Sequence, residues 1–304
     1  MSTNGLEHCL LRRPAAISPA DATASHWRER LIEFLPDFLN SHPRLRPIAS
    51  AAAMALHGST AMGVDDDGSD LDIWLALDKE QVWALNRGAG TGFFGFDLNG
   101  KAGHLNAESW ESLAARIEHC DMDLIFQLRR AVLLRDPCGA FGRLIESAWR
   151  PMRRETRDAL FQYHYVEMRG EHRSCDNPLA RGDAMAALLA VGKTLGHALR
   201  AAMVLDGEPY PYDKWLYRMA VQTKSGGRMA PYVDAALEAL ESGALHRIGS
   251  HKDNPIDRAL NAIRAELIRS AQAAGLSAPW LYQWWLYIPQ SREAQRTARW
   301  ATGD

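Results

Sequence analysis

Two carboxylates within an apolar stretch are the residues of this sequence best suited to chemistry. Asp70 and Asp72 flank Leu71 at the start of the run DLDIWLAL, and alternate residues of a strand point to the same face of its sheet. Neighbouring carboxylates repel each other unless a cation neutralises them. Their oxygens suit magnesium, which completes its coordination with water and substrate phosphates. We therefore predict a metal site here; the alternative is a pair of exposed acids at a strand edge.

A small-residue turn precedes the two aspartates. Gly58 and Ser59 are separated from Asp70 by ten residues. Small residues let a backbone turn approach phosphate oxygens closely and offer N–H groups and a hydroxyl. Ser59 could also serve as a simple helix N-cap, and the two roles are compatible because a helix N-terminus binds phosphate. We expect the acidic residues 65–67 between the two elements to form a solvated loop.

The segment HGSTAMGVDDDGSDLDIWLAL, residues 57–77, resembles the signature of the polymerase-β-like nucleotidyltransferase superfamily. Within that superfamily, the chain resembles the two-domain antibiotic adenylyltransferases that act on aminoglycosides and lincosamides. The resemblance implies transfer of a nucleoside monophosphate, AMP from ATP, to a hydroxyl group with release of pyrophosphate. It also implies that Asp70 and Asp72 hold two Mg²⁺ ions, and that Gly58 and Ser59 hold the β- and γ-phosphates.

A β-hairpin is predicted downstream of the aspartates. Asn99-Gly100 lies between two alternating runs, which is a strong signal for a two-residue turn. That turn pairs Leu98 with Lys101 and Asp97 with Ala102. Side-chain alternation then gives the hairpin an apolar face (Phe94, Phe96, Leu98 and Leu105) and a polar face (Asp97, His104, Asn106 and Glu108).

The polar face is where the resemblance places a third acid. The superfamily usually has one on a neighbouring strand, and the candidates here are Asp97, Asn106 and Glu108. We expect Glu108 to join Asp70 and Asp72 as a catalytic metal ligand, although an exposed acid is an equal alternative. If Asn106 fills the position instead, the site loses a negative charge and the protein could be an inactive homologue.

The remaining elements predict an α+β chain with two domains. A partly ordered leader, residues 1–24, precedes a small mixed-sheet nucleotidyltransferase domain, residues 25–137. Residues 138–304 are predicted to form an all-α helical bundle that binds the acceptor, with several helices that have proline near the start and glycine after the end. We expect the active site in a cleft between the two domains.

Three polar residues of the helical half are candidates for substrate binding. Lys193 lies in an apolar helix and Lys214 follows a Pro-rich turn, and both are candidate nucleotide-binding residues. The position of Lys214 resembles that of the phosphate-binding lysine in adenylyltransferase helical domains. Asp183 is a candidate acceptor-binding residue. The alternatives are an exposed helix face for Lys193 and a favourable first-turn acid for Asp183.

Composition limits the other classes of function. The 304 residues carry a formal net charge of −2, so no global basic field recruits long nucleic acid. No stretch approaches the ~20 apolar residues of a membrane helix, and no signal peptide is evident. The four cysteines include no Cys-x-x-Cys pair, and a reduced, cytoplasmic protein is the default expectation.

The expected function is therefore magnesium-dependent nucleotidyl transfer. The expected partners are a nucleoside triphosphate and a small-molecule hydroxyl acceptor, such as an aminoglycoside-like antibiotic. Two alternatives remain open: transfer to a protein or tRNA, as in toxin-type relatives, and a catalytically silent homologue that binds nucleotide.

Overall fold

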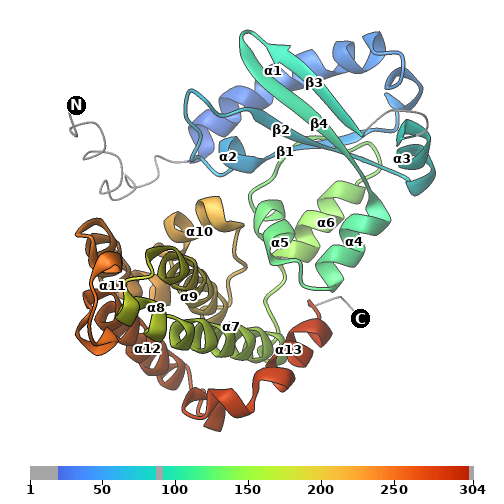
Figure 1. Cartoon of the computed structure of the whole chain (residues 1–304). Helices are drawn as coiled ribbons and strands as arrows, with labels where there is room; N and C mark the ends of the chain where they lie inside the picture. Colours follow the sequence, from blue (N-terminus) through green and yellow to red (C-terminus); the bar gives the residue numbers. More distant parts are fainter. Residues whose placement is uncertain (1–19, 87–91, 301–304) are drawn as a thin grey trace, which may run out of the picture. The chain divides into compact units, whose positions relative to one another are not determined.

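The chain divides into two compact units, drawn in Figure 1. The computed structural model describes residues 20–86 and 92–300, and most of the expected leader, residues 1–24, lies outside them. The first unit, here the sheet unit, comprises residues up to Ile117 together with Gln127–Trp149. The second, the helical unit, comprises Glu118–Phe126 and the residues from Arg150 onward.

A mixed five-stranded sheet forms the centre of the sheet unit. Its spatial order is β3-β4-β2-β1-β5, with β2 and β4 parallel and the other neighbours antiparallel. This sheet, followed by a helical unit, confirms the predicted α+β class. The strands are β1 (Ala53–His57), β2 (Leu71–Leu77), β3 (Phe93–Leu98), β4 (Lys101–Ser109) and β5 (Val132–Arg135).

The alternation of β2 explains why its aspartates face away from the main core. Leu71, Ile73 and Leu75 are fully buried in a cluster with Leu31 and Leu35 of helix α1 (Ala20–Ser41). Because side chains alternate along a strand, Asp72 and Trp74 point to the opposite face. That face of β2 is polar at its start and aromatic two residues later.

The hairpin of β3 and β4 has the predicted turn and register. Leu98 pairs with Lys101 and Asp97 with Ala102. Asn99 and Gly100 have φ values of 57° and 84°, as a type I′ turn requires. The Asp97 carboxylate accepts a hydrogen bond of 2.8 Å from the Gly100 N–H, so it closes the turn.

The sheet unit extends beyond residue 137, where the sequence suggested a domain boundary. Phe141 of helix α6 is fully buried, and its ring packs against Trp74 and Trp110 at centroid distances of 6.0 Å. This packing against the sheet explains why α6 belongs to the first unit. The helices here are α1, α2 (Gly58–Ala61), α3 (Lys79–Asn86), α4 (Trp110–Glu118) and α6 (Ala140–Trp149), with η1 (Arg46–Ile48), while α5 (Met122–Leu128) spans the division.

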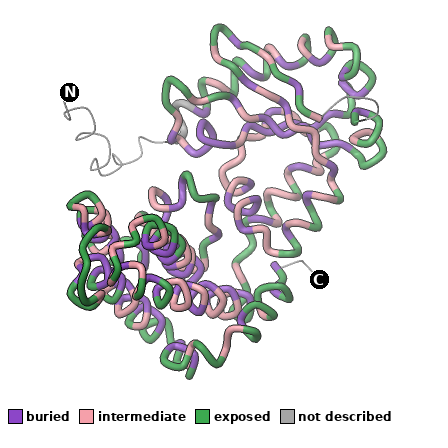
Figure 2. Tube along the Cα trace, in the orientation of Figure 1, coloured by how far each residue is buried: buried purple, intermediate pink, exposed green. Residues whose placement is uncertain are grey.

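The helical unit packs around α9, whose trace in Figure 2 includes buried, intermediate and exposed residues. α9 contacts α7, α10, α11 and α12. It is also long and apolar enough to cross a membrane, contrary to our expectation, although 56% of its most apolar window is buried within the protein. The elements are α7 (Arg154–Ser174), α8 (Asp176–Arg181), α9 (Ala184–Leu205), α10 (Asp213–Ala220), α11 (Lys224–Glu241), α12 (Pro255–Ala273), α13 (Ile288–Thr297), η2 (Ala244–His246), η3 (His251–Asp253), η4 (Pro279–Leu281) and η5 (Trp284–Leu286).

Candidate metal and nucleotide site

The two aspartates lie at the start of β2 with different exposure. The Asp70 side chain, just before the strand, is 51% exposed, whereas that of Asp72 is 24% exposed. The Asp70 carbonyl accepts a hydrogen bond of 3.4 Å from Thr60 Oγ1, which ties the strand entry to α2. One carboxylate is therefore open to solvent and the other is held against the protein.

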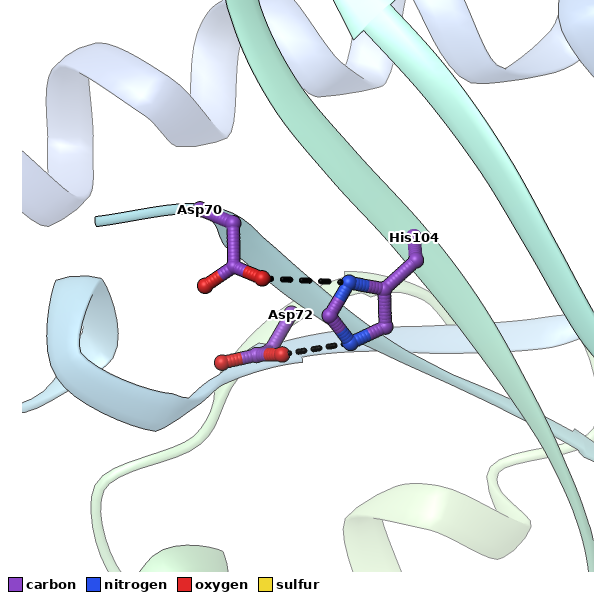
Figure 3. A group of neighbouring side chains, drawn as sticks. All are labelled: Asp70, Asp72 and His104. Atoms are coloured by element: carbon purple, nitrogen blue, oxygen red, sulfur yellow. Dashed lines mark ion pairs between the residues drawn. The ribbon is translucent and has the colours of Figure 1, made fainter. Parts of the chain in front are cut away.

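His104 of β4 bridges both carboxylates (Figure 3). Its Nδ1 lies 3.3 Å from Asp70 Oδ2, and its Nε2 lies 2.7 Å from Asp72 Oδ1. The parallel register places His104 directly beside Asp72. Both contacts are ion pairs when the ring carries a proton on each nitrogen. The imidazolium then supplies the positive charge that two neighbouring carboxylates require.

Gly58 brings the turn at the start of α2 against Asp72. Its φ of 72° lies in the left-handed region that favours glycine. A Cβ atom at this position would overlap Oδ2 of Asp72 and lie 3.0 Å from its Cγ. Ser59, next in the chain, is only 6% exposed. Glycine is therefore required here both by the backbone conformation and by the close approach to the carboxylate.

Aromatic rings line the same face of the sheet. The ring of His57, at the end of β1, stacks on Trp74 with centroids 4.0 Å apart. Phe93 stacks on His104 at 4.6 Å, so it limits the rotation of the bridging imidazole. His57 Nδ1 lies 2.9 Å from Gln127 Oε1, while its Nε2 is buried without a hydrogen-bond partner among the described residues. Burial lowers the pKa of His57 to about 4, so its ring is neutral at physiological pH.

The group formed by Asp70, Asp72 and His104 fits a divalent cation. One ligand atom from each residue lies within 4.8 Å of the other two. The donor set consists of two carboxylate oxygens and one imidazole nitrogen, which divalent metals accept once the nitrogen facing the ion is deprotonated. The side chains present can therefore hold one ion between β2 and β4.

Comparisons of the chain with known proteins give a structural match but no sequence match. No family model matches it, and no curated protein matches it either. Among solved structures, it is similar to a nucleotidyltransferase-like protein from Exiguobacterium sibiricum 255-15. The two chains share 11% sequence identity with a TM-score of 0.45, over 88% of this chain and 81% of that chain.

The structure does not bring the expected third acid to the aspartate pair. Glu108 lies opposite Ala76, and Ala76 is four residues after Asp72 in β2. At the rise of a β-strand, this places Glu108 about 13 Å along the sheet from Asp72. Its carboxylate instead lies 3.4 Å from the Arg116 guanidinium. Asn106 lies opposite Trp74, and Asp97 closes the hairpin turn. Sequence reasoning placed His104 on the correct face but gave it no role in the site.

The three candidates in the helical half have contacts of their own. Lys193 Nζ lies 3.4 Å from Glu171 Oε1, and its side chain is 63% exposed. Lys214 lies over the Trp215 ring, 4.9 Å from its centroid. Asp183 is the N-cap of α9 and accepts a hydrogen bond from the Ala186 N–H. The roles of these residues in nucleotide or acceptor binding stay predictions.

Proposed function

We propose that this chain is a divalent-metal-dependent nucleotidyltransferase. It would transfer a nucleoside monophosphate, AMP from ATP on the sequence resemblance, to a hydroxyl group of a small molecule. The observation that carries the proposal is the convergence of Asp70, Asp72 and His104 beside the Gly58–Ser59 turn. Carboxylates next to a turn of small residues are the elements that phosphoryl transfer needs, since its catalysis is mainly positioning and charge neutralisation.

In this proposal, each element has a distinct task. Asp70 and Asp72 hold the ion, which when bound neutralises phosphate charge and orients the triphosphate. Gly58 keeps the turn close to Asp72, and the backbone N–H groups of the turn and the Ser59 hydroxyl would bind phosphate oxygens. The acceptor hydroxyl oxygen forms a bond to the α-phosphorus, the bond from that phosphorus to the bridging oxygen breaks, and pyrophosphate leaves. The hydroxyl proton passes to solvent.

One observation favours a second candidate, a silent nucleotide-binding protein. His104 occupies the place beside Asp72 and contacts both carboxylates. With its ring protonated, the group already has a cation, and a metal must displace that proton to bind. If displacement is unfavourable under cellular conditions, the site binds nucleotide without chemistry.

The test is pyrophosphate release measured with each of the four ribonucleoside triphosphates. Reactions contain Mg²⁺ or Mn²⁺ and a panel of aminoglycosides, lincosamides and simple polyols, and mass spectrometry identifies the modified acceptor. Asp72→Asn removes one ligand, while Glu108→Gln makes the same acid-to-amide change elsewhere on the same face of the sheet.

Acceptor-dependent release that Asp72→Asn abolishes and Glu108→Gln retains would support the transferase. Metal-dependent nucleotide binding without release from any acceptor would favour the silent protein. Absence of both binding and release would refute both candidates.

A further inference from the structure

A polar cavity lies entirely within the helical unit. It is open to solvent, has a volume of about 460 Å³ and is lined by residues of α7, α8, η3 and α12. We call it the cationic cavity after four of its lining side chains, Arg169, Arg173, Lys252 and Arg258. Its size is that of a small-molecule site.

The carboxylates of the cavity do not balance its cations. Two of them, Asp176 and Asp257, line the wall. Asp176 lies against Arg173 and is also 3.8 Å from His251. Among the described residues, no carboxylate lies within ion-pair distance of the three remaining cations, which are Arg169, Lys252 and Arg258. The wall therefore carries a net positive charge, although the whole chain is slightly acidic.

Buried hydrogen bonds already satisfy the second carboxylate. Asp257 is 5% exposed; its Oδ1 lies 3.1 Å from His172 Nε2, and its Oδ2 accepts from Asn261 Nδ2 at 3.0 Å. Arg169 Nη1 lies 2.9 Å from His172 Nδ1. A guanidinium only donates, so Nδ1 accepts, and the His172 proton lies on Nε2 and points to Asp257. Asp257 is therefore held by these hydrogen bonds, and the lining still has four cations against two carboxylates.

Arg169 is held in the cavity wall with part of its guanidinium unsatisfied. Its Nε is buried and has no hydrogen-bond partner within the part of the chain that the structure describes. Burial, followed by the nearby charge of Arg264, lowers the pKa of Arg169 to about 10. A buried cation beside a like charge is costly, and a buried donor without a partner calls for an explanation such as a bound ion.

We infer that the cationic cavity binds a small molecule through a phosphate group. A phosphate dianion would offset the excess positive charge, and its oxygens match the planar donor fork of arginine. Lys252 and Arg258 are exposed in the cavity lining and have no carboxylate within ion-pair distance among the described residues. The hydrogen bond to His172 holds Arg169 in place. The ligand would be inorganic phosphate or a phosphate monoester, and these two sources share the recognised group.

Calorimetric titration of the full chain with inorganic phosphate, in metal-free buffer, tests the inference. Arg258→Gln removes an exposed cation from the cavity with little risk to the fold. The matched control is Arg154→Gln, which changes an exposed arginine at the opposite end of α7. Parallel titrations with AMP and with succinate compare a phosphate monoester and a dicarboxylate.

We expect saturable phosphate binding. The affinity should weaken at least about tenfold in Arg258→Gln, because one charged hydrogen bond is lost, and should be unchanged in Arg154→Gln. Arg258→Lys should retain part of the affinity, and added salt should weaken binding. Tighter binding of AMP than of phosphate would identify a monoester as the ligand. Absence of saturable binding, equal loss in both glutamine variants, or tighter binding of succinate would overturn the inference.

Discussion

His104 lies directly beside Asp72 on the neighbouring parallel strand, with its Nε2 2.7 Å from Oδ1 of Asp72. The side chain beside the aspartates is therefore an imidazole and not a further carboxylate. The candidate metal group offers two carboxylates and one ring nitrogen. This donor set decides the expected metal preference and the tests of the site.

The aspartate pair gives the first prediction. Asp72→Asn should weaken Mn²⁺ binding by at least about 10–100-fold, because the loss of a residue that only supports a metal ligand already lowers metal affinity by that factor. Glu108→Gln should bind metal as the unchanged protein does, since Glu108 lies opposite Ala76. Metal titration followed by calorimetry measures both. Equal losses in the two variants would contradict the placement of the site.

The choice of metal gives the second prediction. Imidazole suits zinc and other transition metals, while magnesium prefers oxygen ligands. His104→Asp should therefore raise the Mg²⁺ affinity about tenfold or more and lower the Zn²⁺ affinity. The control is His104→Asn, because asparagine has a size similar to that of aspartate but adds no carboxylate. The metal-dependent rise in melting temperature reports each affinity. An aspartate variant that binds Mg²⁺ no better than the asparagine variant would refute the role of His104.

Local sequence patterns predicted several parts of this fold. The alternation in β2 and the turn chemistry of Asn99-Gly100 involve residues close in sequence, so the strand and the hairpin register followed from them. The proximity of Asp70, Asp72 and the Gly58 turn also followed from one short segment.

Long-range pairing could not be predicted in the same way. The residue of β4 that meets Asp72 depends on the parallel register of two strands about thirty residues apart, and a shift of four residues separates His104 from Glu108. The packing of Phe141 on Trp74, which assigns α6 to the sheet unit, likewise joins distant segments. Neither relationship has a local signal in the sequence.

The left-handed turn at Gly58 gives the third prediction. Gly58→Ala should destabilise the fold by more than the ~1–2 kcal/mol of a left-handed residue, because its Cβ also overlaps the Asp72 carboxylate. Gly100→Ala is a matched control, since Gly100 has a φ of 84° but nothing within 4 Å of the added Cβ. Chemical denaturation measures both costs, and only the Gly58 variant should also lose metal affinity. Equal costs would show that the contact with Asp72 does not constrain the turn.

Acid sensitivity gives the last prediction. Burial lowers the pKa of His57 from the ordinary 6.5 to about 4, so below pH 6.5 the unfolded chain binds a proton that the folded chain refuses. The contribution of His57 to the free energy of unfolding is fully present above pH 6.5. It is lost as the pH falls toward 4, and the total loss is on the order of 3 kcal/mol.

Unfolding free energies measured between pH 7 and pH 4 test this dependence. His57→Asn places an amide near the position of Nδ1, which can still meet Gln127, but it does not titrate. The variant should therefore lose less stability over this range than the unchanged protein. His26→Asn, at an exposed position of α1, should leave the acid-induced loss as it is. If both variants keep the full loss, the acid sensitivity arises from other groups, of which the buried His164, whose pKa burial also lowers, is the first to test.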